Sequence, residues 1–171
     1  MLSLSQTAGY AIRAMVHMDG PGGQPRLVQE IAERTGISKP YLSKIVHALA
    51  LKGLLKTKRG YKGGVTLARE ATEITVIEVA DAFDGPEWLE RCILGLDECT
   101  DERACPLHEF WKPTRIKIRH ELSRKTLAEI TEFEKGRSAI SRSAQLENGG
   151  AEDAHDREHA RPITRKGRSR S

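Results

Sequence analysis

The sequence predicts a mostly α-helical protein with one small β-hairpin, which is an α+β fold. Through most of residues 4–49 and 74–83, apolar side chains recur every three or four positions, the period of amphipathic helices. Between these stretches, two short strand-like runs flank a glycine-rich segment at 60–64, as in a β-hairpin. A chain of 171 residues with 38% hydrophobic residues can form one or two small domains.

The first two predicted helices are bounded by capping residues and helix breakers. A helix over 4–18 can be capped by Ser3 or Ser5 and should end at the glycine- and proline-rich segment 19–23. A second, short helix follows over 28–34. A tight turn containing glycine then separates it from the next helical stretch.

The third predicted helix begins after Ser38, with Pro40 tolerated in its first turn. Its buried stripe is formed by Leu42, Ile45, Val46 and Leu49. A short helix, a tight turn and a longer helix with a polar outer face are typical of a helix-turn-helix, whose second helix enters the major groove of DNA. The residues of this polar face that we expect at DNA are Lys39, Tyr41, Ser43 and Lys44.

The hairpin that follows is interpreted as a wing, which makes residues 1–70 a winged helix-turn-helix domain. Its strands are predicted at 54–59 and 65–67. The basic side chains expected to meet DNA are Lys58, Arg59 and Lys62. They can bind phosphates, and an arginine can also enter a narrow minor groove. The alternative is a solvated hairpin with no ligand.

Beyond the wing the sequence predicts a further helix over 74–83 and a long helix beginning at Pro106. The long helix alternates apolar and basic residues, and so apolar a helix beside a small domain is expected to pack against a partner chain. Thr126 and Glu129 form a capping-box pattern that opens a last helix. Beyond about residue 140 the apolar pattern stops, which predicts a disordered basic tail.

The balance of charged residues differs between the three predicted parts of the chain. Residues 1–70 hold 11 Lys/Arg and 4 Asp/Glu, whereas residues 71–140, the cysteine loop and dimerisation helices, hold 10 and 15. The tail, 141–171, is again basic. A basic first part beside an acidic second part indicates a polyanion as the partner of the first.

All three cysteines, Cys92, Cys99 and Cys105, lie in one short loop, and His108 follows. Thiolates are soft ligands that suit zinc, copper(I) and iron–sulfur clusters. The odd number argues against a disulfide framework. A structural zinc site usually has a cysteine pair spaced by two to four residues, which is absent here. An iron–sulfur cluster can use histidine in place of cysteine. The spacing favours a cluster over zinc only slightly, and three unrelated thiols are the third alternative.

Other classes of function have little support. No apolar run approaches the length of a membrane span, and no export signal is visible, so we expect a reducing cytoplasm. The glycines near the wing lack the strand, loop and helix order of a nucleotide-binding loop. No catalytic pair is visible, and an enzyme is not expected.

Four motifs, in the order in which they occur, resemble the IscR/NsrR family of bacterial iron–sulfur transcription regulators. They are residues 37–42, 59–64, 105–108 and 126–130, and the resemblance covers about residues 1–135. The family implies a homodimer of winged-helix domains with a long helix crossing between subunits. It also implies a cluster held by the three cysteines. A dimer of this kind reads a palindromic operator in double-stranded DNA.

Members of this family differ in the fourth ligand. In the IscR branch, a histidine three residues after the last cysteine completes a 2Fe-2S cluster, and His108 matches that position. In the nitric-oxide-sensing branch, an Asp of the first helix can complete a 4Fe-4S cluster, but Ala8 lies near that place. We therefore favour 2Fe-2S. The reserve ligands are Asp97, Glu98 and Glu109.

Two departures from the family pattern matter. The first two cysteines are separated by six residues, where five are typical of IscR. Pro40 and Ser43 replace residues that read bases, so the operator sequence cannot be carried over. The leading hypothesis is a DNA-binding regulator whose cluster senses redox, iron–sulfur or nitric oxide status. The alternatives are a nitric-oxide sensor with a 4Fe-4S cluster, a zinc-stabilised DNA-binding protein and a cluster-bearing electron-transfer protein.

Overall fold

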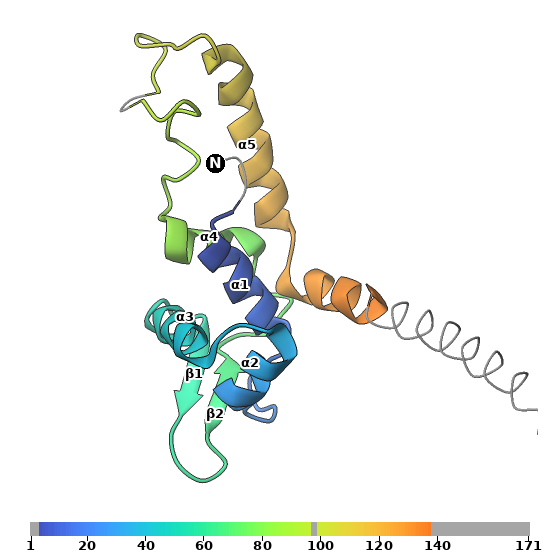
Figure 1. Ribbon diagram of the computed structural model, residues 1–171. Coiled ribbons are helices and arrows are strands. Elements are labelled where there is room, and N and C mark those ends of the chain that lie inside the picture. The colour runs from blue at the N-terminus through green and yellow to red at the C-terminus, as the bar shows by residue number, and fades with distance from the viewer. Residues whose placement is uncertain (1–3, 97–98, 138–171) are drawn as a thin grey trace, which may run out of the picture. The chain divides into compact units, whose positions relative to one another are not determined.

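The computed structural model describes residues 4–96 and 99–137 (Figure 1). The elements are α1 (Gln6–Met15), α2 (Val28–Thr35), α3 (Lys39–Leu51), β1 (Leu55–Lys58), β2 (Gly64–Leu67), α4 (Val76–Asp84) and α5 (His108–Arg124). Residues 127–137 are also helical. The predicted fold class is confirmed. The predicted tail lies outside the described residues. No helix of the described part is long and apolar enough to cross a membrane.

The first helix, α1, is shorter than predicted. Ser5 caps it, because its hydroxyl accepts a hydrogen bond from the Ala8 N–H at 3.1 Å. It ends at Met15 instead of Met18, since the Met18 N–H bonds to the Met15 carbonyl at 3.0 Å in a tighter turn. Both methionines are nevertheless buried and form part of the core.

The turn between α2 and α3 has the geometry of a helix-turn-helix. Gly36 ends α2 with a positive φ of 69°, a conformation that glycine adopts without steric cost. Ile37 is buried directly after it. Ser38 occupies the N-cap position of α3, but its side chain makes no capping hydrogen bond. Pro40, at the start of the helix, has no N–H to donate to it. The predicted stripe from Leu42 to Leu49 is buried.

The wing is an antiparallel hairpin in which Leu55 pairs with Leu67 and Lys58 pairs with Gly64. The other edge of β2 is held by Arg26, which exchanges two backbone hydrogen bonds with Val65 at 3.0 and 2.9 Å. A Cβ atom at Gly64 would lie 2.7 Å from the Arg26 carbonyl oxygen, so only glycine allows this close approach. The bond to Arg26 was not predicted from the sequence.

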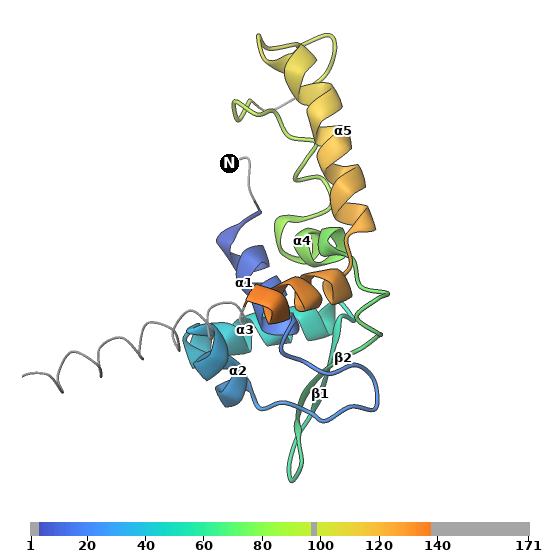
Figure 2. The same cartoon turned by 90° about the vertical axis from the view of Figure 1, so that its right-hand side faces the viewer.

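The end of α5 is bound to the beginning of α4 by backbone hydrogen bonds. The Val76 N–H donates to the Lys125 carbonyl, and the Leu127 N–H donates to the Ile74 carbonyl, both at 2.8 Å. Ile74 and Leu127 are buried in the same core as Met15. Since α4 packs against both α1 and α5, it connects the long helix with the helix-turn-helix (Figures 1 and 2).

The predicted start of the long helix was wrong by two residues. α5 begins at His108, because Pro106 and Leu107 form a turn in which the His108 N–H bonds to the Cys105 carbonyl at 2.9 Å. Pro113 lies within α5, which continues to Arg124.

The predicted capping box at the end of the chain's described part is present. Thr126 Oγ1 accepts from the Glu129 N–H at 3.3 Å, and the Glu129 carboxylate accepts from the Thr126 N–H at 2.8 Å. The Thr126 N–H and the Lys125 ammonium lower the pKa of Glu129 to about 2. The cap therefore holds an ionised carboxylate at neutral pH.

We expect Thr126→Ala to lower the free energy of unfolding by about 1 kcal/mol, since an N–H at the helix start loses its acceptor. Equilibrium urea unfolding measures this change. Ser123→Ala is the matched control, because it removes an exposed hydroxyl that only donates to the His120 carbonyl. The control should stay within about 0.5 kcal/mol of the parent protein. Equal losses in the two variants would contradict a capping role for Thr126.

Candidate metal centre and nucleic-acid interface

The segment between α4 and α5 is held along one face of α5. Trp111, Arg115 and Arg119 are spaced four residues apart, so their side chains lie in a row on the helix. They donate hydrogen bonds to the carbonyl oxygens of Arg91, Glu90 and Pro86, respectively. The bonds of Trp111 and Arg115 are both 2.8 Å long. The segment therefore runs beside α5 although it has little regular structure of its own.

A small apolar core reinforces this attachment. Leu89 and Trp111 are buried together with Ile77 of α4. The partly buried residues that pack against them include Ile93 and Cys99. Hydrogen bonds and apolar contacts thus both place the cysteine-bearing loop on α4 and α5.

The structure brings the four predicted metal ligands together beside the first turn of α5. The sulfur atoms of Cys92 and Cys105 are 3.8 Å apart. Cys99 Sγ lies 3.4 Å from Nδ1 of His108. Cys92 is buried, and His108 is only 2% exposed, so it is not a surface histidine.

The surroundings of Cys92 lower the pKa of its thiol. The backbone N–H of Leu94 lowers the pKa of this thiol, and the N–H of Leu96 adds to the effect, whereas burial opposes it. The side chains of Cys105 and Cys99 also lower it. The thiolate is the form of cysteine that binds metals.

Asp101, which was not predicted from the sequence as a site residue, contacts His108. His108 Nε2 lies 2.8 Å from Oδ1 of Asp101. Lys112 Nζ contacts both oxygens of the same carboxylate, at 2.6 and 2.7 Å. These hydrogen bonds, with Lys112 as the larger cause, lower the pKa of Asp101. The four-residue spacing of His108 and Lys112 places them on one helix face, and this spacing could have suggested a shared partner.

Of the three reserve ligands, the structure describes only one. Glu109 is exposed, and Asp97 and Glu98 lie outside the described residues. Ala8 is fully buried and offers no donor atom. Within residues 4–96 and 99–137, no group of three or more His, Cys, Asp or Glu side chains is arranged to hold a single metal ion.

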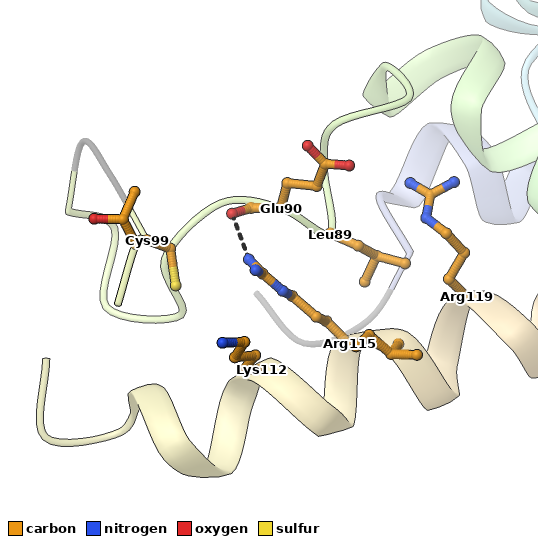
Figure 3. Close-up of a pocket in the computed structure, with 8 residues that line it drawn as sticks. Leu89, Glu90, Cys99, Lys112, Arg115 and Arg119 are labelled. Carbon is orange, nitrogen blue, oxygen red and sulfur yellow. Dashed lines mark hydrogen bonds between the residues drawn. The ribbon is translucent and has the colours of Figure 1, made fainter. Parts of the chain in front are cut away.

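An open hollow of about 450 Å³ lies between the loop and α5 (Figure 3). Its lining includes Cys99 on the loop and Lys112, Arg115 and Ile116 on the helix. Phe110 and Ile116 are 59% and 63% exposed, although both are large and apolar. The long helix therefore keeps two large apolar side chains exposed, one of them at the rim of this hollow.

The predicted DNA-binding face of α3 is exposed at Lys39, Ser43 and Lys44. Tyr41 differs, because it is only partly exposed and its hydroxyl lies 2.7 Å from Thr7 Oγ1. Its ring also packs edge-on against Tyr10, with centroids 6.0 Å apart. Tyr41 therefore links α3 to α1 in addition to any contact with a ligand.

The predicted basic residues of the wing, Lys58, Arg59 and Lys62, are all exposed. Lys62 adopts a positive φ of 56°, and its ammonium lies 5.7 Å from the ring centroid of Tyr61. Tyr61 is 90% exposed at the tip. Tyr61 belongs to the motif at residues 59–64, and its exposure adds an aromatic surface to the basic wing.

The chain is similar in sequence to known transcription regulators. Residues 4–132 match the model of the Rrf2 family, described as iron-dependent transcriptional regulators. The chain is 31% identical over 142 residues to the HTH-type transcriptional regulator IscR of Sodalis glossinidius, covering 82% of this chain and 86% of that protein.

Two solved structures share the fold. The structure of CymR, the global cysteine regulator of B. subtilis, matches with a TM-score of 0.66 and 25% identity, covering 78% of this chain and 98% of that one. IscR of T. potens matches with a TM-score of 0.58 and 28% identity, covering 77% and 87%.

The family match, the IscR relatives and the winged-helix neighbours are all those of DNA-binding transcription regulators and not of enzymes. The family match covers the helix-turn-helix, the wing, the cysteine loop and the long helix. The chain belongs to the Rrf2 family of transcriptional regulators.

Proposed function

We propose that this regulator binds a 2Fe-2S cluster through Cys92, Cys99, Cys105 and His108, and that the cluster sets its affinity for operator DNA. The observation that carries the proposal is the arrangement of these four side chains as two close donor pairs beside α5. A bound cluster supplies one-electron chemistry and is sensitive to oxidants. The signal would then be redox, iron–sulfur or nitric oxide status.

The separations within the pairs suit metal binding. Two thiolates on one tetrahedral metal, with bonds of about 2.3 Å, are about 3.8 Å apart, and a thiolate and an imidazole are about 3.5 Å apart. The corresponding distances here are 3.8 Å for Cys92 and Cys105 and 3.4 Å for Cys99 and His108. Both pairs therefore offer donors at metal-binding separations, and the match to a family described as iron-dependent favours iron over zinc.

The DNA-binding surface is formed by the outer face of α3 and the tip of the wing. In this proposal Lys39, Ser43 and Lys44 approach base edges in the major groove. Arg59 and Lys62 bind phosphates or the minor groove. The exposed apolar surface of α5 pairs with a second copy of the chain. A homodimer of this kind reads a palindromic operator.

The cluster can influence DNA binding because the contacts between them are continuous. His108 is the first residue of α5, and the far end of α5 is bound to α4 through the Lys125 carbonyl. α4 packs against α1. α1 holds the helix-turn-helix through two hydrogen bonds, one between the Thr7 and Tyr41 hydroxyls and one from Arg13 to the Thr35 carbonyl, both 2.7 Å. A change at the loop therefore has a physical route to α3.

We expect single Cys→Ser substitutions at Cys92, Cys99 and Cys105 to abolish the visible absorption of anaerobically purified protein. His108→Ala should destabilise the cluster or alter its spectrum, since mixed-ligand sites depend on their supporting bonds. Iron and sulfide counts accompany each spectrum. Glu109→Ala is the control, because it changes the exposed neighbour of His108 and should leave the spectrum intact. One zinc per chain without iron or sulfide would refute the cluster.

Arg59→Ala should weaken operator binding on the order of tenfold and flatten its salt dependence, because one fewer phosphate contact releases fewer counterions. Fluorescence anisotropy at several salt concentrations measures both quantities. Lys135→Ala removes the same charge outside the helix-turn-helix and wing and should change neither. If affinity and slope are those of the parent protein, the wing does not touch DNA.

Holo and apo protein should differ in operator affinity by roughly 5- to 150-fold, the usual range of coupling between two sites. Titration of one operator fragment with holo, oxidised and apo protein at fixed salt measures the difference. By reciprocity, DNA should change the rate of cluster loss if it binds one state more tightly. Equal affinities in three folded states would reject the sensor, and no DNA binding in any state would favour an electron carrier.

A further inference from the structure

We propose that Asp101 is a positioning residue that makes Nδ1 of His108, and not Nε2, the nitrogen that binds the cluster. This inference rests on the function proposed above, because it concerns the orientation of one of the four ligands. It adds a residue that does not itself touch the cluster. It also assigns a specific ring nitrogen to the metal.

The argument begins with the hydrogen-bonding capacity of the two groups. Asp101 lies between Lys112 and His108, and an ionised carboxylate can only accept hydrogen bonds. At 2.8 Å from this carboxylate, Nε2 of His108 must carry the hydrogen. In a neutral imidazole the lone pair is then on Nδ1. This nitrogen faces Cys99, at 3.4 Å from its sulfur.

Burial holds the ring in this orientation. His108 is 2% exposed, so a rotated ring would have to exchange both of its polar partners inside the packed loop. Rotation would also place the protonated nitrogen toward Cys99 and leave the carboxylate opposite a nitrogen without a hydrogen. The contact with Asp101 therefore decides which tautomer and which ring edge the site presents.

Asp101 alone could not impose this orientation, because its side chain is 71% exposed. Lys112 fixes it by contacting both carboxylate oxygens at 2.6 and 2.7 Å. Lys112 and His108 lie one turn apart on α5, so both can contact the Asp101 carboxylate of the loop from one helix face. The helix that carries the ligand thus also sets its direction. The competing hypothesis is that Asp101 itself binds the cluster in place of His108.

The sharpest test needs no variant. The protein is prepared with histidine labelled with ¹⁵N at Nδ1 only, and in parallel at Nε2 only. Pulsed electron paramagnetic resonance of the dithionite-reduced cluster then compares the nitrogen couplings. We expect strong coupling from the Nδ1 label and weak coupling from the remote Nε2 label. Strong coupling from the Nε2 label would overturn the inference while leaving His108 as a ligand.

Variants test whether Asp101 causes the orientation. Asp101→Ala should speed cluster loss to a chelator by roughly 10- to 100-fold, the usual cost of removing a partner of a metal-bound histidine. Asp101→Asn keeps an acceptor but loses the charge, so it should fall between the parent and Asp101→Ala and retain the Nδ1 coupling. Lys112→Gln should act in the same direction as Asp101→Ala, with a smaller effect.

The control is Glu102→Ala, which removes one exposed acidic charge from the neighbouring position. It should leave the rate of cluster loss and the nitrogen couplings unchanged. Cluster loss in Asp101→Ala at the parent rate, with the Nδ1 coupling retained, would overturn the role of Asp101. A reduced cluster without imidazole coupling would remove His108 from the ligand set and favour Asp101. Protein that binds DNA but holds no iron would end the proposed function together with this inference.

Discussion

The attachment of the cysteine loop to α5 is the constraint on which the candidate site depends. The loop has little regular structure, and its backbone carbonyls need partners. Trp111, Arg115 and Arg119 supply them from one face of the helix. They hold residues 86–91, directly before Cys92, along the helix. Beyond this segment, Cys92 and Cys105 approach each other and Cys99 approaches His108. The helix therefore positions the segment that leads into the site.

The long helix holds both the loop and the candidate site on one face. His108 and Lys112 lie on the same side of α5 as Arg115, which donates a hydrogen bond to the loop. Phe110 and Ile116 remain largely exposed. The far end of α5 is bound to α4 by backbone hydrogen bonds that any sequence can make. This arrangement places the proposed sensing site, the proposed dimer contact and the connection to the DNA-binding helices on one continuous element.

In the winged helix-turn-helix, the residues that hold the fold together differ from those exposed on its outer surface. Tyr41 lies on α3, yet its hydroxyl and ring contact Thr7 and Tyr10 of α1. The exposed lysines beside it have no such partners in that helix and remain available to a ligand. At the wing, Gly64 allows the strand to approach Arg26, while the charged residues gather at the exposed tip. The framework is apolar or hydrogen-bonded, and the outer surface is basic.

The sequence alone determined the features that depend on near neighbours. Apolar spacing predicted the buried stripe of α3, and the pair Thr126 and Glu129 predicted a cap that the structure contains. The clustering of Cys92, Cys99, Cys105 and His108 gave the candidate ligands, because soft donors so close along a chain can meet locally. Helix limits were less accurate, since a tighter turn ended α1 early and a turn at Pro106 delayed α5.

Only the tertiary structure decided the contacts between residues distant in the chain. Three contacts leave no local pattern in the sequence: the backbone bonds between Arg26 and Val65, the hydrogen bond between Tyr41 and Thr7, and the hydrogen bonds that the row of side chains on α5 donates to loop carbonyls. The role of Asp101 could not be predicted for the same reason, because it depends on contacts with His108 and Lys112 of α5. A periodic pattern records which face of a helix is apolar, but not which distant group will meet it. That choice is made when the helices pack.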